Sequence, residues 1–147
     1  MGLELFVGAW TLVSTEHRRS DGQIVFPFGK HPAGLIMYDT EGYMSVHIAG
    51  ADRPKFASGS RLEGTPEEIK IAFETYLAYW GTYEILEKEQ TVIHHIEGGL
   101  IPNDAGRDNR RRYELNGDQL KLLTTPTVMR GEQVTGMLLW RRAKPIR

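Results

Sequence analysis

Two polar side chains, His94 and Arg111, lie in apolar, alternating segments and are the residues best suited to chemistry. In segment 91–96 every second residue shares a face, so Val92, His94 and Ile96 point the same way. An imidazole in such apolar company could donate a hydrogen bond to a ligand, or move a proton near neutral pH. A structural histidine whose nitrogens are both satisfied is the alternative interpretation.

Arg111 lies in a second alternating segment, 111–115. Its period of two places Arg111, Tyr113 and Leu115 on one face, which the apolar members mark as the inward face. A guanidinium inside a protein needs a carboxylate from a side chain or a ligand. We therefore treat His94, Tyr113 and Arg111 as the catalytic candidates, with Arg111 lying at a rim and reaching water as the alternative.

The remaining pocket candidates are aromatic, thioether or small polar side chains of the kind that line apolar pockets. The residues expected to bind a ligand are Ser14, Phe28, Tyr38, Met44, His47, Tyr83, His94, Arg111 and Tyr113. Core packing alone is the competing role for most of them. The chain contains no Gly-x-Ser-x-Gly elbow, so covalent hydrolysis is not expected.

Metal and cofactor sites are not expected. His94 and His95 are adjacent and therefore face opposite sides of a strand, which argues against a shared metal ion. His17, His31 and His47 are scattered over other segments and leave a zinc site as an open alternative.

The composition is that of a folded globular protein. Its 147 residues are 40% hydrophobic and 25% charged, which suits one domain over 1–147 with a sizeable core. The absence of cysteine excludes disulfides and thiolate metal sites. With 18 basic and 19 acidic residues the net charge is -1, so neither nucleic acid nor a membrane is an expected partner. The three consecutive arginines at 110–112 do not change this expectation. The chain shows no export signal, and a cytoplasmic location is expected.

Turn signals divide the chain at short intervals. Asp21-Gly22, Glu41-Gly42, Asn116-Gly117 and Gly131 separate segments rich in β-branched and aromatic residues. These segments predict about nine antiparallel strands, at 10–15, 24–26, 35–38, 43–48, 82–86, 91–96, 111–115, 119–123 and 133–141. Closure into an up-and-down barrel would remove exposed edges and enclose either one small molecule or a core of side chains.

One segment breaks the strand pattern. Thr65-Pro66-Glu67-Glu68 is a capping box with proline at the first helical position. Apolar residues then recur at helical spacing, which predicts a helix over about 65–79. Its apolar face should lie on the barrel mouth or on an outer sheet face, and the loop 50–64 has the length of a lid.

The two ends of the chain resemble the lipocalin signature. Gly8-Ala9-Trp10 opens the first strand, and Leu138-Leu139-Trp140-Arg141-Arg142 ends the last. The resemblance implies that Gly8, Trp10 and Arg141 form the barrel floor, with a cation–π stack between the indole and the guanidinium.

Further motifs extend this resemblance over nearly the whole chain. They are Pro27-Phe28-Gly29, Gly42-Tyr43-Met44-Ser45, Asp52-Arg53-Pro54, Gly81-Thr82-Tyr83-Glu84, His94-His95-x-Glu97-Gly98, Pro102-Asn103, Arg111-Arg112-Tyr113-Glu114-Leu115 and Val134-Thr135-Gly136. Together they resemble the bacterial and fungal lipocalin-like domain family. The fold class expected is mainly β, a single up-and-down antiparallel lipocalin-like β-barrel of the calycin type, with about eight to ten strands and one mid-chain α-helix.

Two function hypotheses follow. The first is binding of a small, largely apolar molecule inside the barrel by a monomer or homodimer. The second is a cofactor-independent enzyme, an isomerase, cyclase or dehydratase, in which His94 shuttles a proton and Arg111 or Tyr113 steadies an oxyanion. In a third hypothesis, the helix and the loop 50–64 form a partner surface and the barrel is a scaffold.

Overall fold

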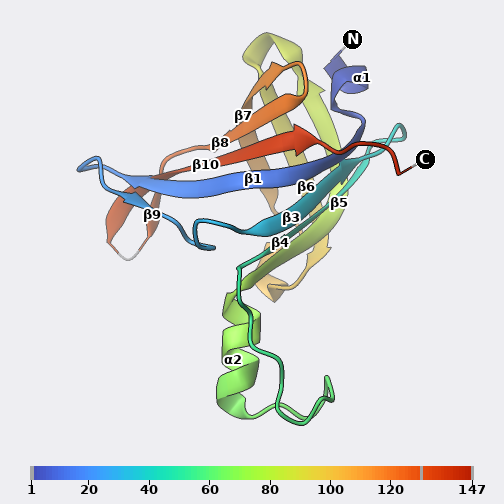
Figure 1. The fold of residues 1–147 in the computed structure, drawn as a ribbon. Helices are drawn as coiled ribbons and strands as arrows, with labels where there is room; N and C mark the ends of the chain where they lie inside the picture. Colours follow the sequence, from blue (N-terminus) through green and yellow to red (C-terminus); the bar gives the residue numbers. More distant parts are fainter. Residues whose placement is uncertain (1, 130, 147) are drawn as a thin grey trace.

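The computed structural model describes residues 2–129 and 131–146, and one antiparallel sheet dominates it (Figure 1). The helices are α1 (Gly2–Phe6) and α2 (Pro66–Glu74). The strands are β1 (Gly8–Arg19), β2 (Ile24–Val25), β3 (Ala33–Tyr38), β4 (Tyr43–Ala49), β5 (Tyr76–Leu86), β6 (Thr91–Gly99), β7 (Asp108–Asn116), β8 (Gln119–Thr124), β9 (Thr127–Met129) and β10 (Glu132–Arg142). Short 3₁₀ turns span Glu87–Glu89 and Pro102–Asp104.

The strands close into a barrel. Their order is β2-β1-β3-β4-β5-β6-β7-β8-β10-β9, and β1 also pairs with β10. Eight strands therefore form a closed antiparallel ring, while β2 and β9 extend beyond it. The predicted fold class is confirmed, and the strand absent from the sequence prediction is the short β9.

The long first strand changes its inward face at a β-bulge. Register shifts between Leu12, which pairs with Trp140, and Ser14, which pairs with Leu139. Trp10 and Leu12 point into the barrel before the bulge, whereas Thr15 is the buried residue after it. A bulge inserts one extra residue and so reverses the alternation that follows. The inward placement expected for Ser14 is therefore wrong.

One end of the barrel is closed by α1 and a cation–π stack. Trp10 is fully buried, and its Nε1 donates to the Phe6 carbonyl at 2.9 Å. The guanidinium carbon lying 4.2 Å from the Trp10 ring centroid belongs to Arg142. The expected role of Arg141 is wrong, because Trp10 pairs directly with Arg142 across the strands while Arg141 pairs with exposed Thr11 and is itself exposed.

Aromatic side chains fill the closed half of the barrel. The Phe6 ring meets Tyr113 edge-on at 4.8 Å and Tyr38 at 5.4 Å. Tyr38 in turn meets Tyr83 at 4.7 Å, and Met44 is buried in the same cluster. This half is therefore occupied by aromatic side chains in mutual contact.

The mid-chain helix is shorter and more exposed than the sequence predicts. The capping box is confirmed, with the Thr65 side chain accepting from the Glu68 amide and Glu68 accepting from the Thr65 amide. The helix ends at Glu74 because Tyr76 already pairs with Ala49 as the start of β5. No residue of α2 is buried, and it extends away from the barrel (Figure 1), so the expected packing on the barrel is wrong.

The loop 50–64 accompanies α2. Arg53 donates from Nη2 to the Ala72 carbonyl at 2.9 Å, and from Nε to Thr75 Oγ1 at 3.0 Å. In the part of the chain that the structure describes, neither helix is long and apolar enough to cross a membrane.

Candidate functional site

A cavity of about 270 Å³ lies inside the barrel, beyond the packed aromatic half. Its apolar lining comes from Phe28, Ile36, Val46, Ile48, Leu77, Leu122, Gly136, Leu138 and Trp140. Its polar lining comes from Thr15, His17, Tyr79, His94, Asp104, Asn109, Arg111 and Thr124. A space of this size, with apolar walls and a few polar groups, suits one small molecule.

His94 is held between two tyrosines. Its Nε2 lies 2.7 Å from the Tyr38 hydroxyl, and its Nδ1 lies 2.7 Å from the Tyr79 hydroxyl. Burial lowers the pKa of His94 to about 3, with smaller contributions from the charges of Arg111 and His95. The imidazole is therefore neutral at neutral pH, with one N–H donor and one lone-pair acceptor.

Strand β7 supplies the cationic part of the wall. Its alternation points Asn109, Arg111 and Tyr113 into the barrel, as the sequence predicts for the last two. Burial raises the pKa of Tyr79, and the Arg111 charge and the neighbouring Asn109 side chain partly offset that rise. Within residues 2–129 and 131–146 no carboxylate lies within ion-pair distance of Arg111, which donates from Nη1 to the Arg110 carbonyl.

The wall continues from β7 through β8 and β10 to β1. Thr15 is buried, and burial lowers the pKa of His17. Thr124 Oγ1 is already used, since it accepts from the Gly136 amide at 2.7 Å. At the base of the cavity Trp140 is fully buried, and its Nε1 is the one buried side-chain polar atom without a partner among the described residues.

The structure separates the residues that the sequence groups together. Of the nine expected to bind ligand, three line the cavity, namely Phe28, His94 and Arg111. Tyr38 stands behind His94, while Met44, Tyr83 and Tyr113 belong to the core cluster. Tyr113 packs against Phe6, so the three catalytic candidates do not meet in one cavity.

Two expected residues lie away from the cavity. Ser14 follows the bulge and is not part of the lining. His47 is on the outer face of β4, where its Nδ1 lies 2.9 Å from the Tyr76 hydroxyl, while Val46 and Ile48 point inward.

Sequence reasoning missed several lining residues, among them Tyr79 and Asn109. Asn109 shares its face with Arg111 and could have been found by extending the same alternation by one step. Tyr79 lies within the predicted helix but belongs to β5, because residues 76–80 fit a helical period as well as a strand period.

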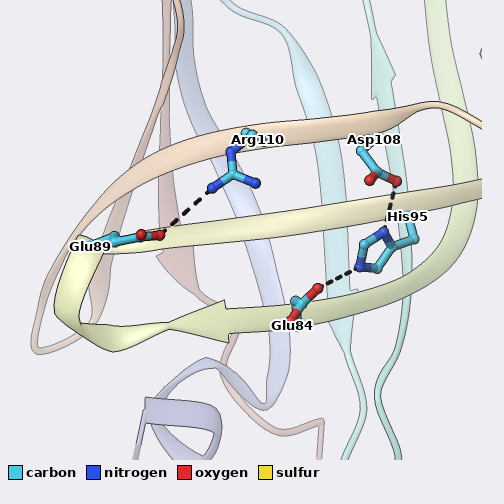
Figure 2. A network of polar contacts seen from close by, with 5 residues as sticks. All are labelled: Glu84, Glu89, His95, Asp108 and Arg110. Atoms are coloured by element: carbon cyan, nitrogen blue, oxygen red, sulfur yellow. Dashed lines mark hydrogen bonds and ion pairs between the residues drawn. The ribbon is translucent and has the colours of Figure 1, made fainter.

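The outer face carries a separate polar network (Figure 2). His95 Nδ1 lies 2.7 Å from Asp108 and Nε2 lies 2.8 Å from Glu84, while Arg110 forms an ion pair with Glu89 at 3.7 Å. Hydrogen bonds that the His95 ring can donate to the Asp108 and Glu84 carboxylates raise the pKa of His95. The network clamps β5, β6 and β7 together, and its side chains do not line the cavity.

The fold and the cavity together define a class. An eight-stranded antiparallel barrel with a tryptophan and an arginine sealing one end, and a cavity toward the other, is a calycin-type barrel. The sequence model of the lipocalin-like domain family matches residues 7–143, and the chain belongs to this family.

Two known proteins are similar to this chain. The 4'-hydroxy-3'-methoxypropiophenone carrier protein ppsC of Aspergillus oryzae is 32% identical over 106 residues, which cover 67% of this chain and 96% of that relative. A lipocalin-like protein from Bacteroides uniformis, known from a crystal structure, aligns with a TM-score of 0.47 at 10% identity, over 95% of this chain and 99% of that one.

Proposed function

We propose that this barrel binds one small, largely apolar molecule that carries a polar group. The observation that supports the proposal best is the internal cavity of about 270 Å³, whose apolar walls are combined with polar groups that include Tyr79, His94 and Arg111. Apolar walls favour transfer of the ligand from water, and a few fixed polar groups orient it.

The relative's name supports the same function and suggests a ligand class. It gives a carrier role and an aromatic ketone as the cargo. A compact aromatic ketone suits a cavity that combines aliphatic walls, the Trp140 indole and hydrogen-bond donors. We propose compounds of this class as ligands.

Binding is better supported than the enzymatic alternative. Acid–base chemistry by His94 would need a pKa near the working pH and a nitrogen free to meet the substrate. Its pKa is lowered to about 3, and both nitrogens already contact tyrosines. These facts favour a structural role for the imidazole.

The test compares two neighbouring leucines of β10. Leu138 lines the cavity, while Leu139 is the adjacent residue on the other face. Leu138→Trp should fill the cavity and abolish binding of 4'-hydroxy-3'-methoxypropiophenone in isothermal titration, whereas Leu139→Trp should bind as the wild type does. Equal binding by both variants, or no binding by the wild type at millimolar ligand, would refute the proposal.

The same samples also test for catalysis. Mass spectrometry of the ligand before and after incubation should find it unchanged. A new product that forms with the wild type but not with Leu138→Trp would favour the enzymatic alternative.

A further inference from the structure

The buried hydroxyl of Tyr38 fixes the direction of the hydrogen bonds around His94. Tyr38 is 1% exposed, and within the described residues its hydroxyl has the His94 Nε2 atom as its hydrogen-bond partner. If Nε2 carried the proton, Tyr38 would accept that hydrogen bond and its own O–H would remain buried and unsatisfied. Unused donors are rarer and costlier in protein interiors than unused lone pairs. The arrangement therefore favours Tyr38 donating to Nε2.

A neutral imidazole that accepts at Nε2 carries its proton on Nδ1. The Nδ1–H group then donates to the Tyr79 hydroxyl oxygen, 2.7 Å away. A tyrosine hydroxyl that accepts this bond still has its own O–H group to donate, and Tyr79 lines the cavity together with Asn109 and Arg111.

Arg111 is the second donor at this wall. Its guanidinium lines the same cavity, and no carboxylate within the described residues forms an ion pair with it. A guanidinium carries only donors. The polar wall therefore offers O–H and N–H donors beside the positive charge of Arg111, and the Asp104 carboxylate lines the same cavity without forming an ion pair with Arg111.

We propose that Tyr79 and Arg111 form an oxygen-binding subsite that selects ligands carrying a carbonyl or carboxylate oxygen. Tyr38 and His94 act as positioning residues, because they orient the Tyr79 hydroxyl from the packed half of the barrel. This inference rests on the proposed function and deepens it by assigning the polar group of the ligand.

Three probes with the same phenyl ring and three-carbon chain test the subsite. Propiophenone offers a neutral carbonyl, 3-phenylpropanoate offers a carboxylate, and propylbenzene offers no oxygen. The wild type should bind one of the oxygen-bearing probes about tenfold more tightly than propylbenzene. Tighter binding of propiophenone would identify a neutral carbonyl ligand, and tighter binding of 3-phenylpropanoate an acid.

Matched variants locate the effect. Tyr79→Phe should reduce the preference for propiophenone over propylbenzene to about onefold, whereas Tyr83→Phe, which removes another buried tyrosine hydroxyl away from the cavity, should retain it. Arg111→Met should weaken 3-phenylpropanoate on the order of tenfold or more, and Arg110→Met on the outer face should not.

The outcomes separate this inference from the proposed function. If propylbenzene binds as tightly as both oxygen-bearing probes, the subsite is refuted while small-molecule binding stands. If no probe binds to the wild type at millimolar concentration, the proposed function fails as well.

A measurement on the wild type covers the case in which Tyr79→Phe does not fold. Nitrogen-15 NMR of histidine-labelled protein reports which ring nitrogen carries the proton. A neutral His94 protonated at Nδ1 is expected, and protonation at Nε2 would overturn the assignment of the free donor to Tyr79.

Discussion

The floor of the barrel gives a sharp prediction, because neighbouring arginines differ in what they contact. Arg142 stacks on Trp10 at 4.2 Å and donates to the carbonyls of Val7 at 2.9 Å and Leu5 at 2.7 Å. Arg141 is exposed and makes none of these contacts. Arg142→Met removes the guanidinium and keeps an apolar stem, and Arg141→Met is the matched control.

The size of the effect follows from the contacts that are lost. A cation–π stack contributes about 0.5–2 kcal/mol, and a hydrogen bond from a charged group about 1.5–3 kcal/mol. The Arg142 side chain is 31% exposed, so water replaces part of this interaction. We expect a loss of roughly 2–4 kcal/mol in the free energy of unfolding, a large part of the roughly 5–15 kcal/mol typical of a domain.

Urea unfolding followed by tryptophan fluorescence measures this loss. With a slope of about 1–3 kcal/mol per molar urea, the midpoint of Arg142→Met should fall by on the order of 1–2 M. Arg141→Met should change the free energy of unfolding by less than about 0.5 kcal/mol. Equal losses in the two variants would show that the floor does not depend on this stack, and the argument from strand register would be wrong.

The adjacent histidines of β6 should respond to pH in opposite directions. Burial lowers the pKa of His94 in the folded protein to about 3, so between about pH 6.5 and 3 the unfolded chain binds one more proton than the folded chain, and stability should fall as the pH drops through this range. His94→Gln should flatten the dependence of the urea midpoint on pH. An unchanged dependence would contradict the burial argument. The folded pKa of His95 is raised by Asp108 and Glu84, so its contribution should be present below about pH 6.5 and be lost as the pH rises through the folded pKa. His95→Asn should remove this decline in stability with rising pH. If the variant shows the same decline as the wild type, the contacts of His95 with Asp108 and Glu84 do not stabilise the fold.

Local alternation predicted most of the barrel, because each strand buries one face against the core. It placed His94 and Arg111 inward, and both line the cavity. It could not locate the bulge after Leu12, since an extra residue leaves no mark in composition yet reverses every side chain beyond it. Thr15 rather than Ser14 therefore points into the barrel, and the local sequence around these two residues does not show which of them is inward.

The predicted end of the mid-chain helix is wrong for a different reason. Residues 76–80 satisfy a helical period and a strand period equally, and pairing with β4 decides between them. The same limit applies to the floor: Trp10 faces Arg142 because of the register between the first and last strands, which are far apart in the sequence. Register between distant strands is a property of the closed barrel rather than of any local segment.

The two halves of the barrel explain why a polar subsite can be precise in a mainly apolar cavity. A hydroxyl that binds a ligand loses affinity if it can rotate toward other partners, because ordering it then costs entropy on binding. Here Tyr79 is restrained by His94, and His94 by Tyr38, whose ring is packed against Phe6 and Tyr83 in the aromatic half. In the proposed subsite, the packed aromatics would stabilise the fold and also hold the Tyr79 donor in place before a ligand binds. If the proposed subsite holds, the aromatic half of the barrel contributes to binding by positioning this donor.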